Sequence, residues 1–422
     1  MVAGILRGKP PTLNNAMKKI QTIALCLALF VAACSQLPIE KAPPACPQAA
    51  PCTACATCPQ PVAPPLVAVP PVAFSRTLQP AAWSDLPGWS EDDVAAAWPG
   101  FLQSCRGMAS KPHGPGWKRV CDLAKANNGS NPRQFFEANL KPYAILAADG
   151  SSNGLVTGYY EPLLRGSRNL VNGFEQPVRG VPDDMLTIDL SAVFPELKDK
   201  RVRGRLEGNK VLPYWSRSEI NARGDKLPSR TLLYVDDAVE LFFLQVQGSG
   251  RVKLADGSMV RLNYADQNGH PYQSIGKVLI ERGELKLEEA SMQGIQAWAR
   301  ANPARLNELL NANPSYVFFR EAPNSKDGPQ GALGVPLVAE RSIAIDPRSV
   351  PLGAPVFLAT TRPNSSKAMN RLVMAQDTGG AIKGAVRADF FWGFGKEAGE
   401  QAGRMKQSGR MWILLPVDLA PK

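Results

Sequence analysis

Three aspartates near the carboxyl terminus stand in or beside turns marked by glycine and proline, next to apolar segments that are typical of strands. They lie in Ile345-Asp-Pro-Arg-Ser-Val-Pro-Leu-Gly353, in Met374-Ala-Gln-Asp-Thr-Gly-Gly-Ala-Ile-Lys-Gly384 and in Val386-Arg-Ala-Asp-Phe-Phe-Trp-Gly393. Because Asp-Pro and Asp-Thr-Gly usually serve turns and caps, Asp346 or Asp377 taken alone is best explained as a structural residue.

Asp389 differs from the other two because it directly precedes Phe390, Phe391 and Trp392 in a segment predicted to be a strand. An apolar neighbourhood disfavours the charged form of a carboxyl group and therefore raises its pKa. A general acid that works near neutral pH needs that shift. Asp389 is therefore the candidate for acid chemistry.

Outward from these turns, strand-like segments fill two parts of the chain, about 154–274 and 316–417. In the first part we predict strands at 155–160, 232–235, 239–247 and 260–264. Their spacing and turn chemistry favour a barrel or a sandwich.

Apolar residues at helical spacing predict helices over Glu91–Met108 and Pro132–Asn139, and a helical region over Gln273–Leu310. Trp89 and Trp98 fit core packing better than a ligand platform. We expect the first helices and the last strands to form one domain and the middle strands a second one. A groove between the two domains is then the default binding site.

The amino terminus has the pattern of a secretory signal, with Lys18 and Lys19 before a short apolar run over 20–33. The run ends at Cys34 in a sequence that resembles the bacterial lipobox, in which the cysteine is acylated and becomes the first mature residue. We therefore expect Met17 to be the true start and 1–33 to be a lipoprotein signal peptide. Ser35 resembles the residue found in lipoproteins sent to the outer membrane.

Residues 34–80 form a tether, because twelve of these 47 residues are proline and the rest cannot build a core. Besides Cys34, four cysteines (Cys46, Cys52, Cys55 and Cys58) lie in the tether without a nearby histidine, so we interpret them as incidental thiols or loose disulfides and not as a zinc site. Cys105 and Cys121 lie in sequence that is expected to fold. In an oxidising compartment they are predicted to form a structural disulfide, and two buried free thiols are the alternative.

The net charge of +11 fits an anionic partner: a phosphate backbone, a membrane surface or the carboxylate-rich peptides of a bacterial wall. No Lys/Arg-rich run with interleaved aromatic residues occurs in the sequence, so nucleic acid is not an expected partner.

Several enzyme classes are disfavoured by the motifs that the sequence lacks. His113 and His270 are the two histidines, which disfavours a zinc hydrolase and a Ser-His-Asp enzyme. Gly393–Ala398 matches a dinucleotide fingerprint loosely, but too few residues follow it for a βαβ unit, and it is predicted to open a short helix. Titratable chemistry must then come mainly from carboxylates, which points to glycosidic bonds, whose cleavage needs an acid on the leaving oxygen.

Longer motifs carry a resemblance to a known family. The spaced aspartates resemble the three-aspartate domain. Four further motifs resemble the membrane-bound lytic transglycosylase A family: Gly154-Leu-Val-Thr-Gly-Tyr-Tyr-Glu-Pro162, Gly204-Arg-Leu-Glu-Gly208, Glu240-Leu-Phe-Phe-Leu-Gln-Val-Gln-Gly-Ser-Gly250 and Tyr264-Ala-Asp-Gln-Asn-Gly-His-Pro-Tyr272. The resemblance runs from about Trp89 to Leu415 and is specific, because several long motifs occur in the same order.

The resemblance implies a mainly β fold with a helical amino-terminal part: a double-psi β-barrel formed by 81–161 and 275–422, and a second small β-barrel inserted at 162–274, with the groove between them. It also implies a peptidoglycan lytic exotransglycosylase that cleaves the β-1,4 bond between N-acetylmuramic acid and N-acetylglucosamine and leaves a 1,6-anhydro end. In the family the catalytic acid is the last of the three aspartates of the 346–389 motif, which corresponds to Asp389. Asp377 is the second candidate, in a supporting role.

The expected partners are peptidoglycan glycan strands, the outer membrane through the lipid anchor on its periplasmic face, and other wall enzymes. Neither a cofactor nor a metal is expected. Six residues in strand ends rich in turns are candidates for sugar binding: Tyr159, Tyr160, Glu161, Gln245, Gln247 and Ser249. A hydrolytic muramidase, with Glu161 or Asp377 as a second carboxylate, and a wall-binding protein without catalysis are the alternatives.

Overall fold

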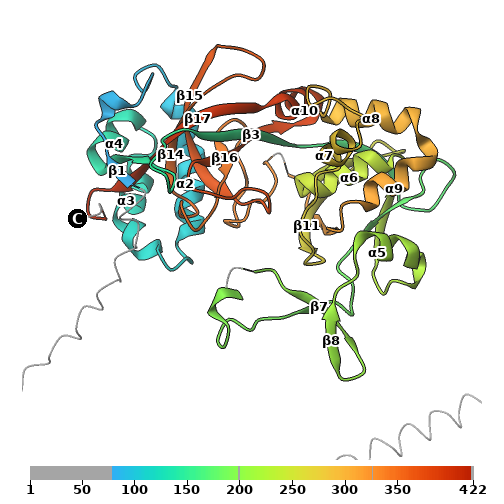
Figure 1. The fold of residues 1–422 in the computed structure, drawn as a ribbon. Helices are drawn as coiled ribbons and strands as arrows, with labels where there is room; N and C mark the ends of the chain where they lie inside the picture. The colour runs from blue at the N-terminus through green and yellow to red at the C-terminus, as the bar shows by residue number, and fades with distance from the viewer. Residues whose placement is uncertain (1–77, 198–199, 326, 420–422) are drawn as a thin grey trace, which may run out of the picture. The chain divides into compact units, whose positions relative to one another are not determined.

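The computed structural model describes residues 78–197, 200–325 and 327–419, which Figure 1 shows as a coloured ribbon. The predicted signal peptide, Cys34 and most of the tether therefore lie outside the described residues. In the described ranges, no helix combines the length and the apolar character that crossing a bilayer requires.

One eight-stranded sheet contains both ends of the described chain. Its strands, in spatial order, are β1 (Leu78–Pro80), β2 (Leu140–Ile145), β17 (Lys406–Pro416), β14 (Pro355–Thr361), β15 (Ala368–Asp377), β13 (Ser342–Ala344), β16 (Arg387–Phe394) and β3 (Gly154–Glu161). Strand β17 also pairs with β3, so the strands from β17 to β3 form a closed ring. Closure satisfies the backbone groups that an open edge would leave unpaired.

Helices cover this closed sheet and share its core. They are α2 (Trp98–Met108), α3 (Gly114–Asn127), α4 (Pro132–Asn139) and α10 (Gly395–Arg404). Trp98 and Phe101 pack against Phe135 and Phe136 in one aromatic cluster of the core. A disulfide between Cys105 and Cys121 joins α2 to α3, in agreement with the predicted pairing. Helix α10 begins at Gly395, where the sequence predicted a short helix.

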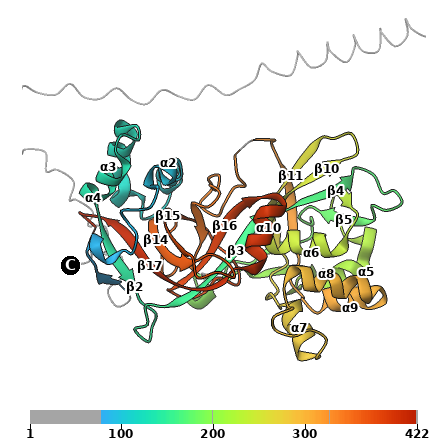
Figure 2. The same ribbon diagram turned by 90° about the horizontal axis from the view of Figure 1, so that it is seen from above.

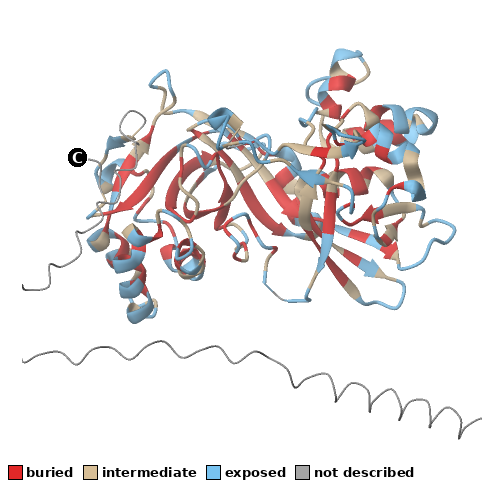
Figure 3. Cartoon of the chain, turned by 90° about the horizontal axis from the view of Figure 1, so that it is seen from below, coloured by how far each residue is buried: buried red, intermediate tan, exposed pale blue. Residues whose placement is uncertain are grey.

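A second, six-stranded sheet follows β3 in the chain. Its order is β12 (Val317–Ala322), β11 (Met259–Gln267), β10 (Ser249–Leu254), β4 (Leu163–Ser167), β9 (Thr231–Val235) and β5 (Gln176–Arg179). A small third sheet consists of β6 (Leu186–Thr187), β7 (Arg203–Glu207) and β8 (Lys210–Pro213). Strand β3 runs from the closed sheet toward this part of the molecule (Figure 2). Figure 3 shows that many residues in the strands of the two larger sheets are buried.

Five helices accompany the second sheet: α5 (Arg217–Arg223), α6 (Ala238–Gln247), α7 (Ile275–Glu281), α8 (Met292–Ala301) and α9 (Leu306–Asn311). Helices α5 and α6 pack against the sheet, and α7 to α9 pack with α6. Short 3-10 helices lie at Trp83–Asp85 (η1), Val94–Ala97 (η2), Pro195–Leu197 (η3), Gly224–Lys226 (η4) and Pro303–Arg305 (η5).

The strand predicted at 239–247 is wrong, because these residues form helix α6. The Asp237 side chain caps the helix by accepting from the N–H groups of Val239 and Glu240, and Gly248 ends it in the left-handed conformation. The helix lies between two apolar clusters: Leu241 and Leu244 pack in one, and Phe242 packs in the other. Burial on two sides removes the polar stripe by which a helix is recognised in sequence.

The predicted return to the first domain at 275 also differs from the structure. Helices α7 to α9 share a core with Val239 and Phe242 of α6, and β12 pairs with β11 in the second sheet. The chain re-enters the closed sheet at β13. The insert therefore extends about 45 residues further than predicted, because its last strand completes a sheet that begins more than 150 residues earlier.

Candidate active site

Strand β3 presents alternate side chains to one side, and these carry the site. Thr157, Tyr159 and Glu161 share this face because side chains alternate along a strand. Val156 and Tyr160 point the other way, into the core of the closed sheet. Strand β3 runs parallel to β16, with Thr157 opposite Asp389. The register therefore places a hydroxyl beside the candidate acid.

Asp389 accepts a hydrogen bond from the hydroxyl of Thr157, with 2.5 Å between Oγ1 and Oδ1. Arg387 donates to the same hydroxyl oxygen at 2.9 Å. Burial raises the pKa of Asp389 to about 6, although the Thr157 hydrogen bond and the charge of Arg387 act in the opposite direction. The residue is still partly accessible to solvent, so a substrate oxygen can reach a carboxyl group that is partly protonated near neutral pH.

Asp377 ends strand β15 and is held by three donors. The Tyr159 hydroxyl donates to Oδ2 at 3.0 Å, and the N–H groups of Ala332 and Thr378 each donate to Oδ1 at 2.9 Å. Burial raises the pKa of Asp377, but the hydrogen bonds oppose that shift because they favour the carboxylate. Asp377 thus accepts three hydrogen bonds that favour its carboxylate, whereas the pKa of Asp389 is raised to about 6.

Asp377 and Asp389 flank the same residue of the short strand between them. Ala344 of β13 is the register partner of Asp377 in β15 and of Asp389 in β16. Since neighbouring strands lie about 4.8 Å apart, the two aspartates occupy positions about 10 Å apart along the sheet. Their side chains affect one another, because the charge of Asp377 raises the pKa of Asp389.

Asp346, the first of the three spaced aspartates, has a different role. Its buried side chain forms two hydrogen bonds with the Arg348 guanidinium, at 3.0 and 2.6 Å, and accepts from the Gly384 N–H at 2.9 Å. The hydrogen bond from Arg348 lowers the pKa of Asp346 to about 2. A carboxyl group that is ionised at every working pH cannot serve as an acid, so Asp346 stabilises the loops around β13 and β16.

The predicted sugar-binding residues on β3 separate into two environments. Tyr160 is buried in the core, and its ring lies against Gly399 of α10. Glu161 is fully buried, accepts from Arg251 at 3.0 Å and lies 3.7 Å from Arg261. In this structure neither side chain has the exposed surface that direct contact with a sugar would require.

The predicted sugar-binding residues near the end of α6 also differ in exposure and position. Gln245 is buried in the helix, whereas Gln247 is partly exposed and its Oε1 accepts from the Tyr160 N–H at 3.0 Å. Ser249 is the first residue of β10 and lies opposite Asn263 of β11. Gln247 and Ser249 thus lie beside the end of β3, on the insert.

Sequence reasoning missed Thr157, Arg387 and the Ala332 N–H. Thr157 stands two places before Tyr159 in a motif that the sequence did highlight, so strand alternation was the available signal. No local pattern brings Ala332 to Asp377, because the contact spans 45 residues. Among the described residues, no group of three His, Cys, Asp or Glu side chains is arranged to hold a metal ion.

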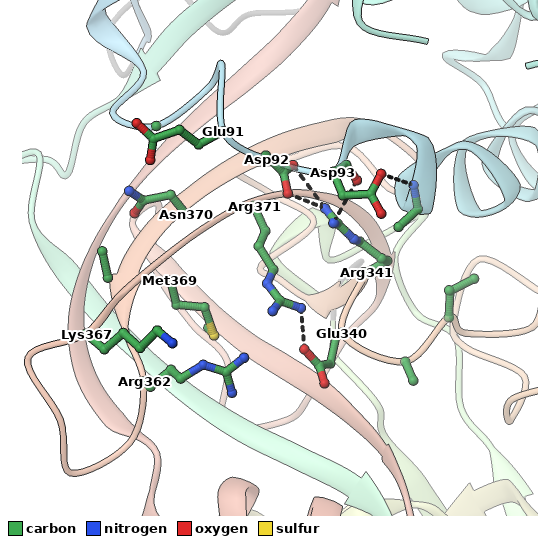
Figure 4. Close-up of a pocket in the computed structure, with 15 residues that line it drawn as sticks. Glu91, Asp92, Asp93, Glu340, Arg341, Arg362, Lys367, Met369, Asn370 and Arg371 are labelled. Atoms are coloured by element: carbon green, nitrogen blue, oxygen red, sulfur yellow. Dashed lines mark hydrogen bonds and ion pairs between the residues drawn. The ribbon is translucent and has the colours of Figure 1, made fainter. Parts of the chain in front are cut away.

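A separate cavity of about 710 Å³ lies at the start of β15, at the other end of that strand from Asp377 (Figure 4). Four of its charged side chains form two ion pairs: Arg341 with Asp92 at 3.0 Å, and Arg371 with Glu340. Neither Asp377 nor Asp389 lines this cavity. The size of this cavity is therefore no guide to the position of the two aspartates.

Family models match both parts of the chain. The MltA specific insert domain matches residues 155–320, and the 3D domain matches residues 341–415. The first range ends close to the end of β12, and the second contains all three spaced aspartates.

Similar proteins carry one consistent description. The membrane-bound lytic murein transglycosylase A of Escherichia coli K12 is 35% identical over 293 residues, which is 68% of this chain and 72% of that protein. The protein of the same name from Vibrio cholerae is 33% identical over 289 residues, or 66% of this chain and 71% of that one.

Solved structures of proteins with the same description have a similar fold. MltA from Neisseria gonorrhoeae superposes with a TM-score of 0.72 at 42% identity, covering 82% of this chain and 93% of that one. Escherichia coli MltA with bound chitohexaose has a TM-score of 0.62 at 30% identity, covering 81% and 95%. The fold, the aspartate site and these likenesses define a peptidoglycan-cleaving lyase, a lytic transglycosylase. More narrowly, the chain belongs to the membrane-bound lytic murein transglycosylase A family.

Proposed function

We propose that Asp389 is the general acid and then the general base of this transglycosylase. The observation that carries the proposal is the contrast between the two central aspartates. Asp377 accepts three hydrogen bonds that favour its carboxylate, whereas Asp389 has a pKa near 6. In the described part of the chain, the Thr157 hydroxyl is the one hydrogen-bond donor to Asp389. Oδ1 is thereby oriented, and Oδ2 is left for the substrate.

The protonated Asp389 gives its proton to the glycosidic oxygen, and the bond from that oxygen to C1 of N-acetylmuramic acid breaks. The 6-hydroxyl oxygen of the same sugar then bonds to C1, and its proton passes to the Asp389 carboxylate. The acid is regenerated and a 1,6-anhydro ring results. The attacking hydroxyl belongs to the ring that reacts, so proximity lowers the barrier and no second catalytic carboxylate is needed. Asp377 supports the site by fixing Tyr159 and the Ala332 segment.

Glycan strands of peptidoglycan are the proposed substrate, and the chitohexaose bound to the Escherichia coli relative supports a β-1,4-linked glycan as ligand. We place the strand beside the partly exposed Thr157 and Asp389 and along the adjoining edge of the insert. Gln247 remains a candidate for sugar contacts there because it is partly exposed, whereas Tyr159 and Ser249 are about as buried as Tyr160. The closed ring of strands supports a double-psi β-barrel as the architecture of the first sheet.

The lipid anchor is proposed at Cys34, with the enzyme on the periplasmic face of the outer membrane. The lipobox-like sequence supports this site, and the relatives are named as membrane-bound. The predicted tether over 34–80 would let the folded part reach the wall.

Mass spectrometry of purified wall digested by the enzyme tests the proposed reaction. Muropeptides with anhydro ends, each lighter by one water than the product of a hydrolytic muramidase, are expected. Products with reducing ends would show that water is the nucleophile and that the enzyme is a hydrolase. Binding of wall without any cleavage would support the alternative of a wall-binding protein without catalysis.

A further inference from the structure

The face of the second sheet that points away from its apolar core is polar and carries several arginines. Arg251 of β10 lies opposite Arg261 of β11, Ser249 lies opposite Asn263, and Asn263 lies opposite Arg320 of β12. Arg261 and Asn263 are 5% and 7% exposed, so this is a buried polar surface and not a solvated one. Such a surface requires partners for its donors and acceptors.

A cavity of about 270 Å³ lies over this face and is lined by Arg261, Asn263 and Arg320. Two carboxylates also line it, but each has a partner of its own. Glu321 accepts two hydrogen bonds from Arg168, at 2.6 and 2.9 Å, and Asp327 accepts from the Ser325 hydroxyl at 3.0 Å. Arg261 is less well matched: it donates to the Ser325 carbonyl at 3.3 Å and lies 3.7 Å from Glu161, a carboxylate that already accepts from Arg251.

Hydrogen-bonding capacity is left unused at this place. In the described ranges, eight buried side-chain polar atoms lack a hydrogen-bond partner, and three of them are Arg261 Nε, Asn263 Oδ1 and Glu161 Oε1. Arg261 and Asn263 both line the cavity. A buried polar atom without a partner costs stability, so a cluster of them beside a cavity is expected where a ligand supplies the missing partners.

Two sets of contacts connect this cavity with the catalytic aspartates. Along β3, the face that holds Asp389 and Asp377 continues to Glu161, which contacts Arg261. From Thr157 to Glu161 the strand covers four residues, about 13 Å. The loop over 328–337 lies between the two places as well: Gln330 accepts from Arg320, and Ala332 donates to Asp377. A glycan bound at the aspartates therefore has the cavity within reach of its substituents.

We propose that Arg261, Asn263 and Arg320 form a carboxylate pocket for the acidic substituent of a muramic acid residue in the bound glycan. The inference rests on the proposed function. Guanidinium groups donate hydrogen bonds and carry charge but cannot accept, so they match a carboxylate better than a sugar hydroxyl. The sugar backbone is uncharged, and the carboxylates of the substrate lie on the attached peptide or, where the peptide has been removed, on the lactyl group. The unpartnered Oδ1 of Asn263 is an acceptor, so it matches the N–H of a peptide amide next to such a carboxylate and not the carboxylate itself.

Arg320→Gln in the full-length protein is the first test, because Arg320 is exposed and Gln330 is the one hydrogen-bond partner of its side chain among the described residues. Three glycan substrates are compared: strands with peptides, strands stripped by an amidase so that the lactyl carboxylate remains, and strands whose carboxylates have been converted to methyl amides. Relative to wild type, kcat/KM is expected to fall about tenfold on strands with charged substituents, as for one lost hydrogen bond to a charged group. It should fall far less on the methyl amides.

Arg300→Gln is the matched control, because it removes one exposed cation from α8 and leaves the pocket intact. A selective loss in Arg320→Gln on peptide strands alone assigns the pocket to a peptide carboxylate. A selective loss on stripped strands alone assigns it to the lactyl carboxylate, and a selective loss on both shows that the pocket accepts either carboxylate. An equal loss on all three substrates, or the same loss in Arg300→Gln, overturns the pocket while the transglycosylase stands. Absence of anhydro products from the wild type overturns the proposed function and the pocket together.

Asn263→Leu supplies a second test that does not depend on an exposed residue. Leucine has a similar volume and removes the buried oxygen that lacks a partner. We expect an unchanged or higher Tm together with a lower kcat/KM on charged strands, because the acceptor serves the ligand and not the fold. A lower Tm with unchanged kcat/KM would assign Asn263 to folding and overturn its place in the pocket.

Discussion

The Thr157 hydroxyl lies 2.5 Å from the Asp389 carboxylate and joins it to Arg387, whose guanidinium contacts the same hydroxyl oxygen. Both Thr157 and Arg387 favour the charged form of Asp389, while burial favours the neutral form. The pKa near 6 is thus a balance in which burial dominates. This value keeps a usable fraction of the acid protonated near neutral pH and still leaves a carboxylate that can act as a base.

Replacing Thr157 should move the pH profile. Thr157→Val removes the hydrogen bond that stabilises the carboxylate, so the pKa of Asp389 should rise further. The rate depends on the protonated acid, and the alkaline limb of kcat/KM, near pH 6 in the wild type, should shift upward by up to about one pH unit. Steady-state rates from pH 4 to 9 measure this shift. Thr157→Ser, which keeps the hydroxyl, should retain the wild-type limb; a limb that stays in place in Thr157→Val would contradict the assignment.

Asp389→Asn should lower cleavage by about 10²–10⁴-fold, because asparagine keeps the shape but cannot transfer the proton. Asp377→Asn should cost less, since Asp377 acts by orienting Tyr159 and Ala332. Release of anhydro muropeptides measures both variants. An active Asp389→Asn with an inactive Asp377→Asn would exchange the two roles.

Asp389→Asn is expected to lose activity without losing stability. The folded-state pKa of Asp389, about 6, is above the ordinary value, so this carboxyl group contributes stability at low pH and loses it as the pH rises through 6. Asp389→Asn should consequently have a Tm equal to or above that of the wild type at pH 7 to 8, which thermal unfolding can check.

Asp346 should show the opposite pH dependence. Its folded-state pKa of about 2 is below the ordinary value, so its ion pair contributes stability above about pH 4 and loses it as the pH falls toward 2. Asp346→Asn should therefore lower the Tm at pH 7, and the difference from wild type should shrink below pH 4. A difference in Tm that is independent of pH would mean that the charge of Asp346 is not what stabilises the loops.

The bond between Cys105 and Cys121 closes a segment with a sequence separation of 16, which corresponds to a stabilisation of about 3 kcal/mol in the chain-entropy description. Replacing both cysteines by alanine should lower the free energy of unfolding by about this amount without changing the cleavage products. Denaturant unfolding measures the loss. Labelling of both thiols in the denatured, unreduced wild type would rule the bond out.

Cys34 should decide the location of the protein. If Cys34 is acylated, Cys34→Ala should move the protein from the outer-membrane fraction to the periplasm while the folded part keeps its activity. Fractionation followed by a wall-digestion assay distinguishes the two locations. A variant that remains in the outer membrane would exclude the lipid anchor at this residue.

Much of the fold could be predicted where local patterns act alone. The β3 motif, the helix at Pro132–Asn139 and the short helix after Gly393 follow from alternation, helical spacing and glycine. The α6 segment could not be recognised, because burial on both sides hides a helical period. The end of the insert was placed too early, since β12 joins its sheet only through long-range pairing.

The site also combines features that local sequence predicts with features that depend on tertiary contacts. The apolar residues after Asp389 predicted its raised pKa correctly, because the cause lies in its own strand and its packing. Tyr160 was grouped with Tyr159 although neighbouring strand residues face opposite sides. Glu161 faces the same side as Tyr159, but it forms ion pairs with arginines that are distant in sequence. Contacts such as Ala332 with Asp377 depend on tertiary structure that no local pattern records.

The alternation along β3 also limits how the sequence of this enzyme can change. Inserting or deleting one residue between Thr157 and Glu161 would turn every later side chain to the opposite face. Glu161 would then lose Arg251 and Arg261 while Thr157 kept Asp389. Length changes should therefore be tolerated in the turns of the insert, beyond Pro162, and rejected within these few residues, so we expect homologues with very different inserts to keep this strand at a constant length.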